Sequence, residues 1–99
     1  MDIPKKVLIG GHEYPVEVFN GGARFANAGD LNTWTQEIRI NTMDDHPESS
    51  QAEAFLHEII EAINHDNELK LEHRNITILG AQLFAVIRNN NLDFRKGRK

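Results

Sequence analysis

The chain has 99 residues, the size of one small domain, and its apolar content of 39% and charged content of 26% are typical of a soluble globular protein. No apolar run is long enough to cross a membrane. Cysteine is absent, which excludes disulfides and thiolate metal sites, so any metal must be held by His, Asp or Glu. We expect a cytoplasmic protein, because no apolar segment typical of a secretory signal follows the N-terminus.

The net charge of −4 is unevenly distributed. The C-terminus carries four positive charges, on Arg95, Lys96, Arg98 and Lys99. Residues 1–94 contain 7 basic and 15 acidic residues. The basic tail, residues 92–99, could contact an acidic surface or nucleic acid, although a solvated terminus is the simpler explanation. The acidic domain, residues 1–91, argues against a nucleic-acid partner, and we expect no membrane partner.

Two short strands joined by a turn are predicted at the N-terminus. Residues 7–9 are apolar, Gly10-Gly11 favours a tight turn, and apolar residues alternate with others over residues 14–18. Pro15 lacks a backbone donor, which favours an edge position. These features predict a β-hairpin, with His12 exposed just past its turn.

A third strand is predicted after a connection rich in Gly and Asn. Residues 20–30 have the composition of an irregular link. Over residues 32–41, Trp34 and Ile38 share one face with further apolar residues, while polar side chains occupy the other. We therefore expect a half-buried strand in which Trp34 anchors the core or its rim; contact with a substrate is the alternative role.

An amphipathic helix is predicted from about residues 47–51 to about residue 64. Its apolar residues recur at the i, i+3, i+4, i+7 spacing of a helix. On the other side His57, Glu61 and His65 follow at intervals of four residues, which places neighbours about 5–6 Å apart at Cβ. One metal ion could bridge His57 and Glu61, with Glu58 beside them. The alternative is an ordinary solvated helix face, since such pairs are common.

A second helix, more buried than the first, is predicted from the apolar residues between 76 and 87, and we expect it to end near residues 89–91. Gly80 within it costs about 1 kcal/mol relative to Ala. A residue this small could let the helix approach its neighbour closely. His73 precedes this helix.

The strand over residues 35–41, the H-E-x-x-E motif within residues 55–64 and the closing segment over residues 71–90 together resemble the small zincin-like metallopeptidases. The resemblance is closest to the short versions carried by phages and prophages, and it covers roughly residues 33–91. It implies a phage- or prophage-encoded protein in a bacterial host cell. In the H-E-x-x-H form of the motif two His hold zinc and the Glu is the general base, and here Glu61 stands in the second His position.

The resemblance implies an α+β fold with a zincin-like minimal core, in which an N-terminal β-hairpin and an edge strand pack against two main helices. It also implies zinc as cofactor, held by His57 and Glu61, with Glu58 activating the zinc-bound water. The third ligand of the family lies downstream and varies in type. His73 is the first choice for it, and His65 is the alternative.

The strand ending at Ile40 resembles the edge strand of the family, to which an extended peptide substrate adds as a further strand. The substrate-binding residues implied are Glu37, Ile38, Arg39 and Ile40. Candidates to stabilise the oxyanion are Tyr14 and His46.

Three functions remain open from the sequence. The first is an active zinc-dependent metallopeptidase that hydrolyses peptide bonds of a peptide or protein substrate with a metal-activated water. The second is a catalytically inactive zincin-like protein that serves as a binding module. The third is a small interaction protein without a metal.

Overall fold

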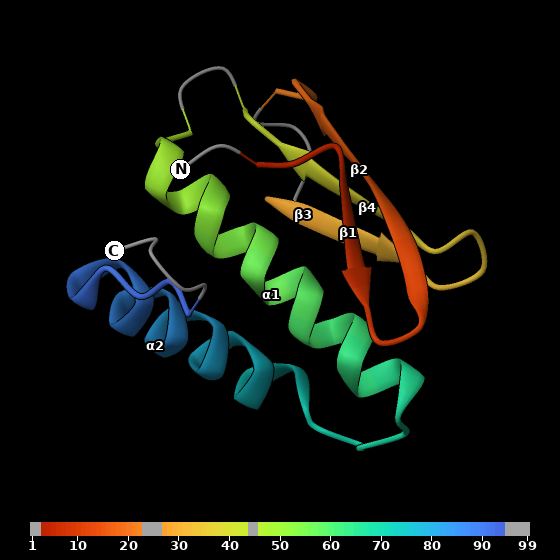
Figure 1. The fold of residues 1–99 in the computed structure, drawn as a ribbon. Helices are drawn as coiled ribbons and strands as arrows, with labels where there is room; N and C mark the ends of the chain where they lie inside the picture. Colours follow the sequence, from red (N-terminus) through yellow and green to blue (C-terminus); the bar gives the residue numbers. More distant parts are fainter. Residues whose placement is uncertain (1–2, 23–26, 44–45, 95–99) are drawn as a thin grey trace.

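The computed structural model describes residues 3–22, 27–43 and 46–94, so the last five residues of the basic tail lie outside the described part. The elements are β1 (Lys6–Ile9), β2 (His12–Phe19), β3 (Gly29–Asn32), β4 (Glu37–Asn41), α1 (Glu48–Asp66) and α2 (His73–Asn90). They form three layers, in which α1 lies between the sheet and α2 (Figure 1). The predicted α+β class is confirmed, with an N-terminal hairpin, an edge strand and two helices.

The sheet is mixed, with the strand order β1-β2-β4-β3. β2 pairs with β1 in an antiparallel hairpin through residues 12–15 and with β4 in parallel through residues 16–19. β3 then pairs with β4 in antiparallel fashion. Pro15 therefore lies on an interior strand, not on the predicted edge strand. The sheet tolerates it because this half of β2 has a strand partner on one side only.

The single strand predicted over residues 32–41 is in fact two strands joined by a turn at residues 33–36. The side chain of Asn32 accepts hydrogen bonds from the backbone N–H groups of Trp34 (3.0 Å) and Thr35 (3.1 Å), which holds the turn. Trp34 is 95% exposed at this turn, so its predicted place in the core is wrong. The first two residues of β3, Gly29 and Asp30, were predicted to belong to the irregular link over residues 20–30.

β4, the strand that ends just after Ile40, is not an edge strand. It pairs with β2 on one side and with β3 on the other, so its backbone cannot add a peptide strand. The predicted substrate-binding role of Glu37, Ile38, Arg39 and Ile40 through such addition is therefore wrong. The edge strand on this side of the sheet is β3.

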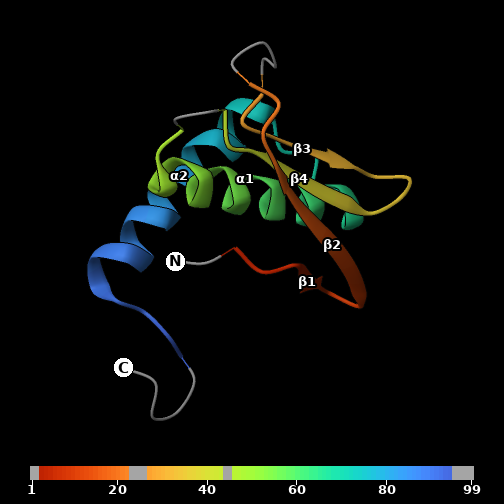
Figure 2. The ribbon, with the colours of Figure 1, turned by 90° about the horizontal axis from the view of Figure 1, so that it is seen from above.

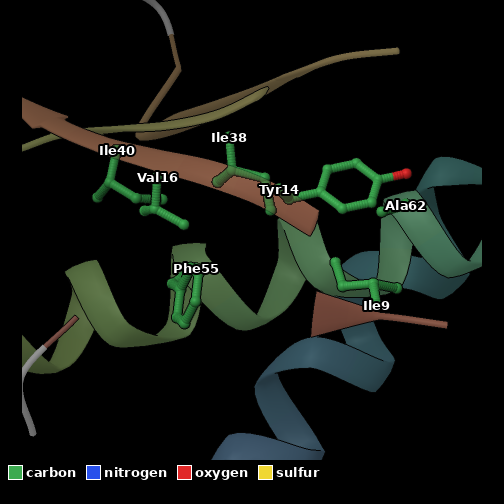
Figure 3. Close-up of a cluster of buried hydrophobic side chains, with 7 residues drawn as sticks. All are labelled: Ile9, Tyr14, Val16, Ile38, Ile40, Phe55 and Ala62. Carbon is green, nitrogen blue, oxygen red and sulfur yellow. The ribbon is translucent and has the colours of Figure 1, made fainter. Parts of the chain in front are cut away.

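The hydrophobic core lies between the sheet and one face of α1. Figure 3 shows Ile38 and Ile40 of the sheet above Phe55 of α1. The members are Ile9, Tyr14, Val16, Ile38 and Ile40 from the strands and Phe55 and Ala62 from α1. Ile38 and Ile40 are fully buried, and burial of such a side chain contributes about 1.5–3 kcal/mol. This packing sets which face of α1 is turned away from the sheet.

The second helix ends where predicted, but it is not the more buried one. Ile76 and Gly80 are its buried residues, whereas Leu79, Leu83 and Val86 are 43%, 45% and 47% exposed. Within the described elements α2 contacts α1 alone, and the two helices cross at an angle (Figure 2). Neither described helix is both long and apolar enough to span a bilayer.

Tyr14 joins the sheet to the end of α1. Its side chain is 1% exposed, and its hydroxyl donates a hydrogen bond to Oδ2 of Asp66 at 2.6 Å. It therefore belongs to the core and to the last turn of α1, and it is not available as an oxyanion stabiliser beside the H-E-x-x-E motif.

The ionisation of Tyr14 is expected to report on this contact. Burial, followed by the hydrogen bond to Asp66, raises the pKa of Tyr14 to about 12. The folded state then holds the phenol proton more tightly than the unfolded state, so stability falls as pH rises from about 10 to about 12. Because Tyr14 is the only tyrosine, the absorbance of tyrosinate measures it alone. We expect the pH midpoint of the Tyr14 titration to lie near 12 in buffer and near 10 in denaturant. A midpoint near 10 in both would contradict the buried contact between Tyr14 and Asp66.

Candidate metal centre

Three potential metal ligands from the two helices converge. His57 and Glu61 lie one turn apart on α1, and His73 is the first residue of α2. One ligand atom of each lies within 4.8 Å of the other two. The separations are 3.7 Å between His57 Nε2 and Glu61 Oε2 and 3.4 Å between His73 Nδ1 and Glu61 Oε2. The structure thus brings together the three residues that the sequence analysis put first.

The donor set and its spacing are compatible with zinc. Two imidazoles and one carboxylate are ligands that zinc accepts, at about 2.0–2.2 Å from the metal. Ligand atoms around a tetrahedral ion at that distance lie roughly 3.3 Å apart. The separations to Glu61 exceed this value by about 0.4 Å for His57 and about 0.1 Å for His73, and the separation of the two imidazole nitrogens is within 4.8 Å, so side-chain rotation has to bring the three ligands together around one ion.

The three potential ligands differ in how far their side chains are exposed to solvent. The side chains of His57, Glu61 and His73 are 16%, 27% and 75% exposed, so the cluster opens on the α2 side. The rings of His57 and His73 meet edge to face, with centroids 5.0 Å apart. Burial lowers the pKa of His57, against the opposing effect of Glu61. The neutral imidazole is therefore favoured, which is the form that coordinates a metal.

The connection between the helices places His73. The side-chain oxygen of Asn64 accepts a hydrogen bond from the backbone N–H of Leu71 at 2.8 Å, which ties the connection to α1 two residues before His73. Further along α2, a Cβ on Gly80 would lie 3.4 Å from Cα of His57, so the glycine allows the close helix approach that the sequence suggested. His65, the alternative third ligand, lies in the last turn of α1 and is not in the cluster.

Glu58 lies beside the cluster, on the side that faces the sheet. It is only 7% exposed, and a Cβ on Gly29 of β3 would lie 3.3 Å from its Cγ. The pKa of Glu58 is raised to about 7, mainly because burial disfavours the charged carboxylate and also because Glu61 and Asp30 repel it. A buried carboxylate that exchanges its proton near neutral pH has the property of a general base.

A groove of about 790 Å³ runs over the cluster. α1 forms its floor, β3 lies on one side and α2 on the other. From Ser50 to His65 the floor spans 15 residues of helix, or about 22 Å, which accommodates roughly six or seven residues of extended peptide. His46 also lines this groove, whereas His12 lies on β2 and does not.

Gly29, Asp30 and Glu53 are among the groove residues that the sequence did not indicate. Glu53 precedes His57 by four residues, so the helical period could have placed it on the same face. Gly29 and Asp30 lie on β3, whose existence depends on its pairing with β4. There Arg39 donates two hydrogen bonds to the carboxylate of Asp30, at 3.0 and 3.2 Å.

We expect the buried carboxylate of Glu58 to destabilise the metal-free protein above neutral pH. Its pKa is higher in the folded state than in the unfolded state, so unfolding releases the proton and stability is lost as pH rises from about 4.5 to about 7. The substitution Glu58→Gln removes this loss. Its effect on the free energy of unfolding should therefore be about 2–3 kcal/mol more favourable at pH 8 than at pH 4. Urea unfolding with a chelator, at both pH values, measures the difference.

A matched control for that experiment is Glu17→Gln, which removes an exposed carboxylate from β2. It changes the net charge equally but should leave the pH dependence of unfolding close to that of the parent. Equal pH dependence in Glu58→Gln and the parent would show that the carboxylate is not buried in the way described.

No protein-family model, no curated protein and no solved structure matches this chain. The chemistry of the groove is therefore inferred from its own residues.

Proposed function

We propose that this protein is a zinc-dependent metallopeptidase. The observation that carries the proposal is the convergence of His57, Glu61 and His73 next to the buried carboxylate of Glu58. The resemblance to zincin-like peptidases implies the roles of His57 and Glu58, whereas Glu61 departs from the family's second His and His73 is the first choice for its third ligand. Their convergence from two helices, in a groove that borders an edge strand, supports a metal centre over a chance H-E pair on a solvated helix.

The ligand set has the composition of the His₂Glu zinc sites found in known hydrolases. When bound, zinc supplies Lewis acidity, which polarises a carbonyl and makes water easier to deprotonate. His57 and Glu61 hold the ion from the helix that forms the groove floor, while His73 completes the set from the second helix. The negative charge of Glu61 makes the ion a weaker acid than three neutral ligands would.

Glu58 is the residue we assign to proton transfer. It lies one residue from His57 and faces the β3 side of the groove, where a peptide carbonyl can be attacked. In this role its carboxylate accepts the proton of the attacking water and delivers it to the leaving amine. It packs between α1 and β3 and is 7% exposed, in the groove.

The substrate we propose is an extended peptide that pairs with β3. Gly29, Asp30 and Leu31 of this strand line the groove, and β3 has one strand neighbour, β4, in the described sheet. Addition of a peptide strand to such an edge is a common recognition mode. β3 thus takes the part that the sequence analysis assigned to β4. The absence of cysteine suits a reducing compartment, and we propose the bacterial cytoplasm.

Metal analysis tests the ligand set. Protein purified without a histidine tag should bind about one equivalent of zinc, and His57→Ala or His73→Ala should weaken zinc binding at least tenfold in competition with a chelator, because each removes a direct ligand. His65→Ala and His12→Ala are matched controls, since neither residue belongs to the cluster. Loss of zinc in His65→Ala but not in His73→Ala would contradict the proposed set.

Turnover tests the role of Glu58. We expect Glu58→Gln to retain zinc but to lose hydrolysis of a fluorogenic peptide mixture by a factor of about 10²–10⁴, because it cannot accept the water proton. Zinc content and peptide cleavage are measured on the same preparation. Zinc bound by the parent without cleavage of any peptide would contradict the peptidase and favour the inactive binding module.

A further inference from the structure

The charges that line the groove are of one sign. Four carboxylates contribute to its surface, on Asp30, Glu53, Glu58 and Glu61, and no Lys or Arg of the described chain does. Three of the four already have a partner or a role. Asp30 is bound by Arg39, Glu61 lies against two imidazoles, and Glu58 is the buried base. Glu53 is left over.

Glu53 is placed to contact a substrate close to the reacting bond. It lies on α1 one turn before His57, so the two residues are about 5–6 Å apart at Cβ on the same helix face. Its side chain is partly buried in the groove wall, and no ion pair or hydrogen bond of its carboxylate is found within the described part of the chain. A half-buried carboxylate that lacks a cation is a favourable site for one.

The charges of the chain that precedes α2 act in the same direction. Residues 1–72 contain 5 basic and 14 acidic residues, and residues 73–99 contain 6 basic and 1 acidic residue. A divalent ion in the centre offsets Glu58 and Glu61 but leaves Glu53 uncompensated. Glu58, which is more than nine-tenths buried and also unpaired among the described residues, lies in the same groove, and acidic residues gathered in one groove give it a negative potential. Such a potential concentrates cationic ligands and repels anionic ones.

We infer that the substrates are polypeptides with a Lys or Arg side chain within about two residues of the cleaved bond, and that Glu53 is the residue that recognises it. This inference rests on the proposed function. Side chains on one face of an extended peptide repeat about every 6.6 Å, close to the separation of Glu53 from His57. A cationic side chain next to the bond at the metal centre therefore reaches the carboxylate of Glu53, while its backbone pairs with β3.

Peptides that differ at one position test the inference. The zinc-loaded protein is given fluorogenic octapeptides of one sequence, with Arg, Gln or Glu at a position that is moved along the peptide. We expect kcat/KM to be about tenfold higher for Arg than for Gln at a position within two residues of the cleaved bond, and lowest for Glu. Glu53→Gln should reduce the Arg preference to less than about threefold, and Glu53→Lys should reverse it.

Glu17→Gln is the control for net charge, because Glu17 lies on β2 and outside the groove, and it should keep the parent's preference. A preference that is absent in the parent, or unchanged in Glu53→Gln, overturns the inference.

The same peptides separate failure of the inference from failure of the proposed function. If no peptide is cleaved, the affinity of labelled peptides for the zinc-loaded protein is measured by fluorescence anisotropy. Tighter binding of the Arg peptide that depends on Glu53 supports cation recognition, and the absence of cleavage then contradicts the peptidase alone. Binding that does not depend on the charge of the peptide overturns the inference whether or not cleavage occurs.

Discussion

The structure depends on α1 being packed on two sides. One face buries Phe55 and Ala62 against the sheet, and another lies against α2, where Gly80 meets the backbone of His57. Since residues on a helix are about 100° apart, the residues between these two faces are turned toward a groove. That groove is where Glu58 and Glu61 lie. The candidate centre therefore exists because one helix is held by two different partners.

The polar residues of this groove destabilise the folded protein, whereas the hydrophobic core stabilises it. A carboxylate as buried as Glu58, with no hydrogen bond found for it in the described chain, is energetically unfavourable when charged. Proteins retain such residues mainly where they have a function. The isoleucines of β4 and the contact between Tyr14 and Asp66 hold the same helix in place and offset this cost.

Small local contacts position the parts of the centre that lie outside α1. The side chain of Asn64 holds the backbone of Leu71, which brings the start of α2 to the cluster. The side chain of Asn32 closes the turn that separates β3 from β4. The smallness of Gly29 lets β3 approach Glu58 closely. Asparagine and glycine thus set the width of the groove, although neither takes part in the proposed chemistry.

The sequence by itself determined the class of the fold, the hairpin, the approximate extent of both helices, and the position of His57 and Glu61 on one face of α1. These features are encoded locally, by turn residues and by the helical period, or by a motif whose spacing is itself helical. Gly10-Gly11 and the repeat along α1 needed no distant partner to be interpreted.

Only the tertiary structure decided which strand is at the edge, where Trp34 lies and which residues border the groove. Trp34 shares the parity of Ile38 and Ile40 although it lies in the turn, because a turn of four residues preserves the parity of a strand. Similarly, the apolar residues of α2 predict burial, but burial requires a second partner, and the described chain offers α2 only α1. Strand order and exposure are set by contacts between distant segments, which periodicity along the chain does not encode.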